Sequence, residues 1–154
     1  MTLQQWADNG WLKKHKTSRK EISNLLAIVH RDLADARDGG ISEDWRFGIA
    51  YNAALKLCAM LLFAEGYRPS QNLAHYRTLQ ALPLIFGAER KRDADYLDTC
   101  RSKRNTAEYD YAGSVTENDA DELIEFAEHL EKAVMNFLKA NYPELVPGKS
   151  AEDP

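Results

Sequence analysis

The spacing of apolar residues along this chain is helical almost throughout. Apolar positions recur at intervals of three or four over long stretches, and no run of strict alternation is long enough to predict a strand. This pattern predicts an all-α fold, built as an antiparallel helical bundle of four to five main helices preceded by a short N-terminal helix.

Turn and capping residues separate the periodic segments. Ser18 and Thr116 each stand three residues before an acidic residue, which is the spacing of a capping box. Glycine and proline punctuate the other boundaries, at Gly39-Gly40, at Gly66 and at Pro83. We expect the most apolar of these helices, residues 43–65, to be central and most buried. The predicted helices are 3–14, 18–38, 43–65, 73–82, 89–109 and 117–142.

A length of 154 residues suits one domain with a sizeable core. We assign residues 1–142 to this domain. Pro143 and Pro147-Gly148 then introduce a polar segment, and residues 143–154 are predicted to form a disordered C-terminal tail.

The charge of the chain is unevenly distributed. A net charge of −4 does not favour nucleic-acid binding by the molecule as a whole. Residues 117–131 hold seven carboxylates and no Lys or Arg, and we interpret them as a solvated helix face rather than a metal site. A local basic surface is expected instead from the cations of residues 90–104, which are Arg90, Lys91, Arg92, Arg101, Lys103 and Arg104.

Other sequence features favour a cytoplasmic protein without a cofactor or a membrane contact. Cys58 and Cys100 lie far apart and have no metal-ligand spacing. The first residues lack the apolar core of a secretory signal. The most apolar run, 49–64, contains Asn52 and Lys56 and is shorter than the roughly 20 residues that a bilayer crossing requires.

The segment 101–111, Arg-Ser-Lys-Arg-Asn-Thr-Ala-Glu-Tyr-Asp-Tyr, has residue types that indicate chemistry rather than packing. An arginine fork suits phosphate, and a tyrosine ring can stack on a base. The alternative is a solvated face that carries an Arg104–Glu108 ion pair. The segment predicts a site for RNA or a nucleotide, formed by Arg101, Lys103, Arg104, Asn105, Tyr109 and Tyr111.

In an α-helix, Arg104 and Tyr109 would be offset by about 140°. Within one copy of the segment, the Arg104 and Tyr109 side chains therefore cannot both contact the same ligand atom. Four histidines lie outside the segment, and His75 is the best placed of them because it begins a predicted helix beside Tyr76 and Arg77. His75 and Tyr76 could form a small pocket, and the sequence does not distinguish this from core packing. We interpret His15, His30 and His129 as surface or core residues.

Four features together resemble the HEPN family, a nucleotide-binding helical domain of higher eukaryotes and prokaryotes. They are the helix segment 50–56, its ending Glu65-Gly66-Tyr67-Arg68-Pro69, the segment 75–79, and the arginine-rich run before an acid-capped last helix. The likeness spans residues 18–140. It implies a helical bundle that acts as a homodimer.

The family's catalytic signature is an arginine, usually a polar residue next, and a histidine four to six positions beyond the arginine. Arg104 and Asn105 match, Tyr109 stands in the place of the histidine, and Tyr111 fits a tyrosine that some toxins carry two residues later. In ribonuclease members two copies of the motif meet, and the RNA 2′-hydroxyl attacks its own phosphate without a metal. Tyrosine, with a reference pKa of about 10, is a poor general base at neutral pH.

These features support three hypotheses. The leading one is a HEPN-like homodimer that binds RNA or a nucleotide in a toxin–antitoxin or defence system and has a degenerate catalytic site at Arg104 and Tyr109. The second is a metal-independent endoribonuclease toxin. The third is a docking protein for a nucleotidyltransferase antitoxin.

Overall fold

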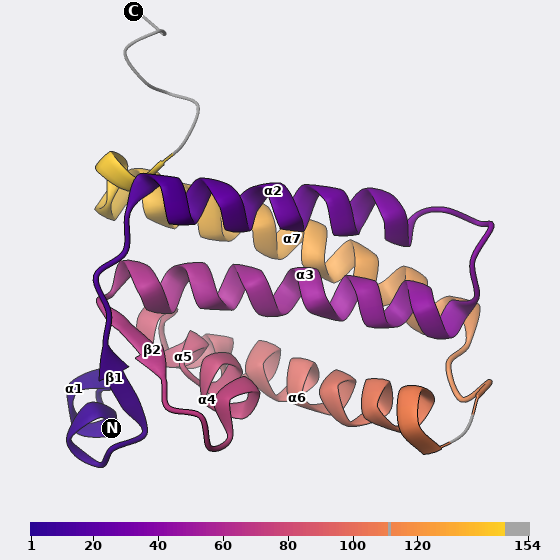
Figure 1. The fold of residues 1–154 in the computed structure, drawn as a ribbon, viewed down its shortest axis with the longest axis horizontal. Helices are drawn as coiled ribbons and strands as arrows, with labels where there is room; N and C mark the ends of the chain where they lie inside the picture. The colour runs from indigo at the N-terminus through magenta and orange to yellow at the C-terminus, as the bar shows by residue number, and fades with distance from the viewer. Residues whose placement is uncertain (111, 147–154) are drawn as a thin grey trace, which may run out of the picture.

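Four long helices form the body of the molecule in a computed structural model that describes residues 1–110 and 112–146. They are α2 (Arg19–Ala36), α3 (Glu43–Ala64), α6 (Lys91–Asn105) and α7 (Glu117–Asn141), and each runs antiparallel to the one before it (Figure 1). The prediction of an all-α antiparallel bundle is confirmed.

The central element is α3, as predicted. It packs against α2, α6 and α7, and Leu57, Met60 and Leu61 on it are fully buried. By length and hydropathy α3 could also cross a membrane, but 61% of its most apolar window is buried inside the bundle. Its apolar character is therefore accounted for by its place in the core.

Side-chain caps set the starts of three of the four long helices, α2, α3 and α7. The Ser18 hydroxyl accepts a hydrogen bond from the Glu21 amide, and the Ser42 hydroxyl accepts one from the Trp45 amide. Thr116 and Asp119 exchange both bonds of a capping box. These bonds satisfy amides that have no partner within the helix, which is why the predicted starts are correct.

The N-terminal segment differs from the prediction of one helix over residues 3–14. Helix α1 (Leu3–Asp8) ends before Gly10, whose φ of +81° suits glycine. Strand β1 (Leu12–Lys14) then pairs antiparallel with β2 (Tyr67–Pro69). The strands are too short to show alternation, and the pairing joins distant parts of the chain, so local periodicity could not reveal it.

The connection between α3 and α6 holds two short helices, α4 (Ala74–Gln80) and α5 (Leu82–Phe86), and a 3₁₀ turn over Ala88–Arg90. Pro83 was expected to lie in a loop. It lies instead in the first turn of α5, where a residue without an amide hydrogen is tolerated.

The predicted tail begins too early. Pro143–Leu145 forms a 3₁₀ turn, and Leu145 and Val146 are buried against the bundle. Both apolar side chains lose solvent contact there, which favours an ordered segment. The rest of the predicted tail, residues 147–154, lies outside the described residues.

Candidate nucleic-acid interface

The basic segment lies at the end of α6 and continues into a π-helical turn, Thr106–Asp110. A π-turn closes hydrogen bonds between residues five apart, so the 140° offset expected between Arg104 and Tyr109 in a continuous α-helix does not describe this segment. Tyr109 lies on the turn with 76% of its surface exposed.

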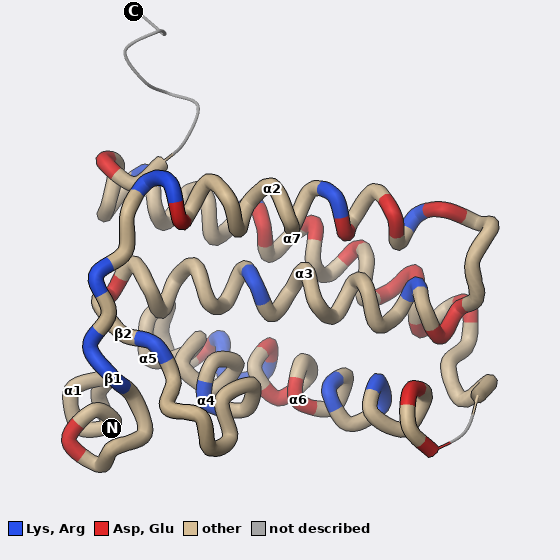
Figure 2. The backbone as a smooth tube through the Cα atoms, viewed as in Figure 1, with Lys and Arg blue, Asp and Glu red and all other residues tan. Residues whose placement is uncertain are grey.

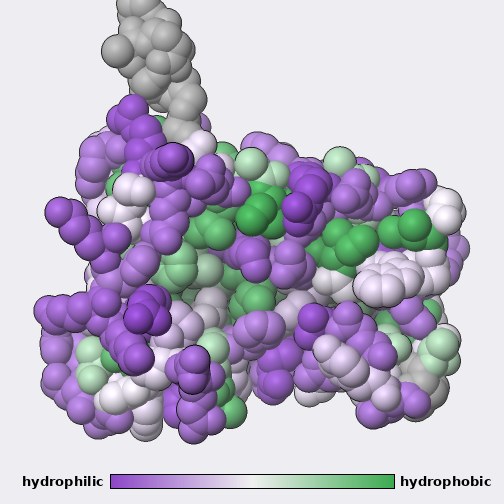
Figure 3. Space-filling view, in the orientation of Figure 1, coloured by the Kyte–Doolittle hydropathy of each residue, from purple (hydrophilic) through white to green (hydrophobic). Residues whose placement is uncertain are grey.

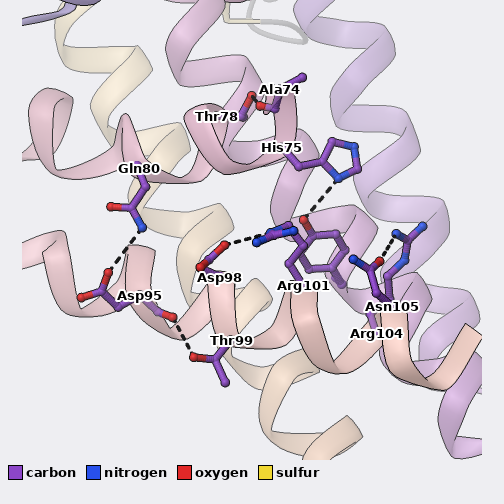
Figure 4. A network of polar contacts seen from close by, with 11 residues as sticks. Ala74, His75, Thr78, Gln80, Asp95, Asp98, Thr99, Arg101, Arg104 and Asn105 are labelled. Atoms are coloured by element: carbon purple, nitrogen blue, oxygen red, sulfur yellow. Dashed lines mark hydrogen bonds and ion pairs between the residues drawn. The ribbon is translucent and has the colours of Figure 1, made fainter. Parts of the chain in front are cut away.

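Arg104 lies against the central helix rather than in open solvent. Its guanidinium carbon is 5.6 Å from the centre of the Tyr51 ring. Its Cγ would be 3.8 Å from a Cβ placed on Gly48, so the arginine stem runs along the α3 backbone. Nε pairs with a Glu108 oxygen at 2.8 Å, and Nη1 donates to the Asn105 amide oxygen at 3.2 Å (Figure 4). The Arg104–Glu108 ion pair of the alternative interpretation, a solvated helix face, is present.

Unlike Arg104, the residues Arg101 and Asn105 face α4. Together with His75 and Tyr76 they line a surface pocket of about 420 Å³. Arg101 is held in place by Asp98, whose carboxylate is 2.8 Å from the arginine Nε. The described residues that line the pocket include no Asp or Glu; the others are Gln71, Leu73 and Ala74. The described lining therefore supplies one cationic side chain, Arg101, which is paired with Asp98, and no carboxylate.

His75, for which the sequence left open a small pocket with Tyr76 or core packing, lines this pocket. Figure 4 shows its ring extending from α4, with a dashed line to the Tyr51 hydroxyl oxygen, which lies 3.5 Å from His75 Nδ1. Partial burial and then the charges of Arg104, Lys56 and Arg101 lower the pKa of His75, so its neutral form dominates at neutral pH. The one sequence signal was its position beside Tyr76 at the start of a predicted helix.

Tyr51, a buried residue of α3, contacts both His75 and Arg104. Its side chain is 1% exposed, and its hydroxyl oxygen lies 3.5 Å from His75 Nδ1. Burial raises the pKa of Tyr51 well above its ordinary value, so the hydroxyl stays protonated. A neutral hydroxyl from α3 thus holds the histidine ring, while the tyrosine face receives the guanidinium of Arg104.

Leu73, at the rim of the pocket, has a left-handed backbone with φ of +57°. For a residue with a Cβ this conformation is unfavourable by about 1–2 kcal/mol. Leu73 precedes α4 and makes no side-chain cap bond to it, and it is 53% exposed. Strain of this kind persists where surrounding contacts impose it, and it clusters at ligand sites.

Lys103 and Tyr109 do not line this pocket. Lys103 Nζ pairs with Asp119 at 2.8 Å, and this contact comes first among the causes that lower the pKa of Asp119. Because Asp119 also caps α7, Lys103 joins α6 to α7. Tyr109 does not line the pocket, and Tyr111 lies outside the described residues.

The acidic run of α7 meets cations of neighbouring helices. Figure 2 shows acidic positions following one another along the first half of α7. Asp121 pairs with Arg46 at 2.7 Å, and Glu128 pairs with Arg37. In the described part of the chain, no group of three or more His, Cys, Asp or Glu side chains is placed to hold a metal ion.

Two of the remaining histidines are engaged far from the pocket. His15 Nε2 lies 2.7 Å from Glu21, and His30 Nε2 lies 2.7 Å from Glu131. The structure brings together Arg101, Asn105 and His75, with Arg104 at the edge. It does not bring Lys103 to them.

Comparison with known proteins adds no relative to this arrangement. No protein-family model matches the chain, and no curated protein and no solved structure is significantly similar to it. The HEPN resemblance therefore rests on the sequence features described above.

Proposed function

We propose that the protein binds RNA or a nucleotide through a phosphate group held in the pocket between α4 and α6. One observation carries this proposal: Arg101, Asn105 and His75 line one pocket, and no described lining residue is acidic. Arginine offers paired donors for phosphate oxygens, and the Asn105 amide adds a further polar contact. The exposed ring of Tyr109 provides a face on which a base can stack.

The wider proposal is a catalytically degenerate HEPN-like protein of a toxin–antitoxin or defence system. Arg104 and Asn105 match the first two positions of that family's motif, and Tyr109 replaces its histidine. Arg104 lies on α6, packs over the Tyr51 ring of α3 and pairs with Glu108. A role in docking a nucleotidyltransferase antitoxin becomes the better account if RNA and nucleotides do not bind.

A titration of purified protein with labelled single-stranded RNA tests the proposal. Binding should weaken as salt rises from about 50 to 200 mM, because phosphate contacts release counterions. The RNA should remain intact over the same incubation in EDTA. Failure to bind RNA or any nucleotide at low salt would contradict the proposal.

A second candidate, a metal-independent ribonuclease, is favoured by one observation. His75 has a lowered pKa and lines the same pocket as Arg101, so a neutral imidazole lies beside a phosphate-binding cation. Such a group can accept the proton of an RNA 2′-hydroxyl, which tyrosine cannot do efficiently at neutral pH. Cleavage that persists in EDTA and is lost in His75→Gln would establish this activity in place of simple binding.

Under the binding proposal, RNA affinity should rise as the pH is lowered from about 7.5 to 5.5. His75 is neutral in the free protein, and a bound phosphate favours its protonated form, so binding takes up a proton as the pH falls toward the histidine pKa. One unit of pKa difference between free and bound protein gives at most about a tenfold gain. Fluorescence anisotropy of labelled RNA at several pH values measures it.

His75→Gln is the control for this pH dependence, since glutamine keeps a polar side chain and does not titrate. The variant should bind RNA with an affinity that changes much less over the same pH range. An unchanged pH profile in His75→Gln would place the titrating group elsewhere.

We also propose a homodimer that meets at the end of the bundle where α3 begins and α6 ends (Figure 1). Two large aromatic side chains, Trp45 and Tyr109, are 60% and 76% exposed near this end. Apolar side chains also show along α2 and α3 on one face (Figure 3). An isologous contact there would bring two copies of the basic segment together.

Light scattering at tens of micromolar protein should give the mass of a dimer. Trp45→Glu should shift the protein toward monomer, because a charge placed in an apolar contact is unfavourable. The matched change Leu73→Glu, at a similarly exposed leucine, should leave the mass unchanged. A monomeric wild-type protein would rule out this assembly under those conditions.

A further inference from the structure

A second pocket, of about 630 Å³, lies on the other side of α4 from the proposed phosphate site. It is an open surface pocket lined by the N-terminal segment, α4, α5 and the start of α6. Its volume falls within the range of small-molecule sites, about 300–1,000 Å³. The side chains that matter for the argument are Trp6, Trp11, Tyr76, Arg77, Gln80 and Lys91.

Arg77 is stacked on an aromatic wall in this pocket. Its guanidinium carbon is 3.8 Å from the centre of the Trp11 ring and 5.8 Å from that of Trp6. The two tryptophan rings meet edge to face at 5.9 Å. Stacking on Trp11 holds the guanidinium plane in a fixed orientation before any ligand arrives.

The cation of Arg77 lacks an acidic partner within residues 1–110 and 112–146. Its Nε is buried and makes no hydrogen bond there, although a buried donor without a partner is unfavourable by about 1–3 kcal/mol. No carboxylate of those residues pairs with the guanidinium. This contrasts with Arg101 and Arg104, which are both paired.

A second cation stands at the rim. Lys91 Nζ is 2.7 Å from Asp95 and 3.0 Å from the amide oxygen of Gln80, which fixes its position on α6. Asp95 does not line the pocket, and no described lining residue is acidic. The lining thus combines aromatic and aliphatic surface, including Pro83 and Leu84, with two positive charges.

From this arrangement we propose that the pocket binds a small organic anion with a flat apolar body, of the class of aromatic carboxylates. The Arg77 fork receives the carboxylate, Lys91 adds attraction at the rim, and the apolar body lies among Trp6, Trp11 and Leu84. The inference goes beyond the proposed phosphate site and does not depend on it, because neither Arg101 nor Asn105 lines this pocket.

Calorimetric titration with 2-naphthoate, and with 2-naphthamide as its uncharged analogue, tests the proposal. The carboxylate should bind at a single site per chain and about tenfold or more tighter than the amide. Arg77→Gln should weaken 2-naphthoate by about tenfold to a hundredfold. Arg92→Gln, which removes an exposed cation of α6 outside the pocket, should leave its affinity unchanged.

Arg77 of α4 also stacks on Trp6 and Trp11 of the N-terminal segment. Arg77→Gln is therefore expected to lower the free energy of unfolding as well as the affinity for 2-naphthoate. Lys91→Gln provides the second readout, since Lys91 is exposed and its replacement should weaken 2-naphthoate severalfold without loss of the fold. No binding at millimolar 2-naphthoate, equal binding of the amide, or unchanged affinity in both variants would overturn the proposal.

Discussion

Leu61→Ala is expected to lower the free energy of unfolding by about 2–5 kcal/mol. Leu61 lies on α3 with none of its surface exposed, in the cluster that joins α3 to α2 and α7. Removing its isobutyl group takes away buried apolar surface and leaves a cavity that neighbouring helices can close only in part. Urea unfolding followed by far-ultraviolet circular dichroism measures the change.

The matched control is Leu73→Ala, the same substitution at a leucine that is 53% exposed. Leucine and alanine both have a Cβ, so the left-handed backbone at position 73 is equally unfavourable before and after the substitution. We expect a difference within about 0.5 kcal/mol. An equally small effect at Leu61 would mean that α3 is not the central helix of the bundle.

Replacing both Arg101 and Arg104 with glutamine should weaken single-stranded RNA binding by about 2–4 kcal/mol, or about 30-fold to 1,000-fold. Two charge-assisted contacts to phosphate would be lost, while the glutamine side chains retain polarity and part of the packing stem. The dependence of affinity on salt should also become shallower, by about one unit of slope for each phosphate contact. Fluorescence anisotropy over a range of salt concentrations measures both quantities.

The control is the double substitution Arg68→Gln and Arg92→Gln. It removes the same charge from two exposed positions that line neither pocket. Only the general attraction between protein and RNA should fall, by less than about 1 kcal/mol. Equal losses in the two double variants would mean that binding reflects net charge and not the pocket between α4 and α6.

The long helices could be predicted from the sequence because the evidence for each is local. The apolar spacing of α3 and the caps at Ser18 and Thr116 lie within the segments that they define. The pairing of β1 with β2 has no such local evidence, since it depends on two three-residue segments from distant parts of the chain meeting in space. The burial of Val146 likewise depends on the bundle that receives it.

The candidate site was predicted in part for the same reason. Arg101, Arg104 and Asn105 lie close together in the sequence, so their residue types alone drew attention to them. His75 lies beside them only because α4 packs on α6. This contact joins distant parts of the chain and could not be predicted from local sequence patterns. Lys103 is two positions from Arg101 and therefore faces another side of the helix, where α7 supplies Asp119.

The burial of Tyr51 has a consequence for how the pocket between α4 and α6 would discriminate among ligands. His75 and Arg104 are supported by a side chain of the bundle's innermost helix, so they lose little conformational entropy when a ligand arrives. Gln71 and Leu73 at the rim belong to a turn and have no such support. The floor of the pocket would then supply affinity, while substitutions in the rim could change which ligand is preferred and leave the folded state intact.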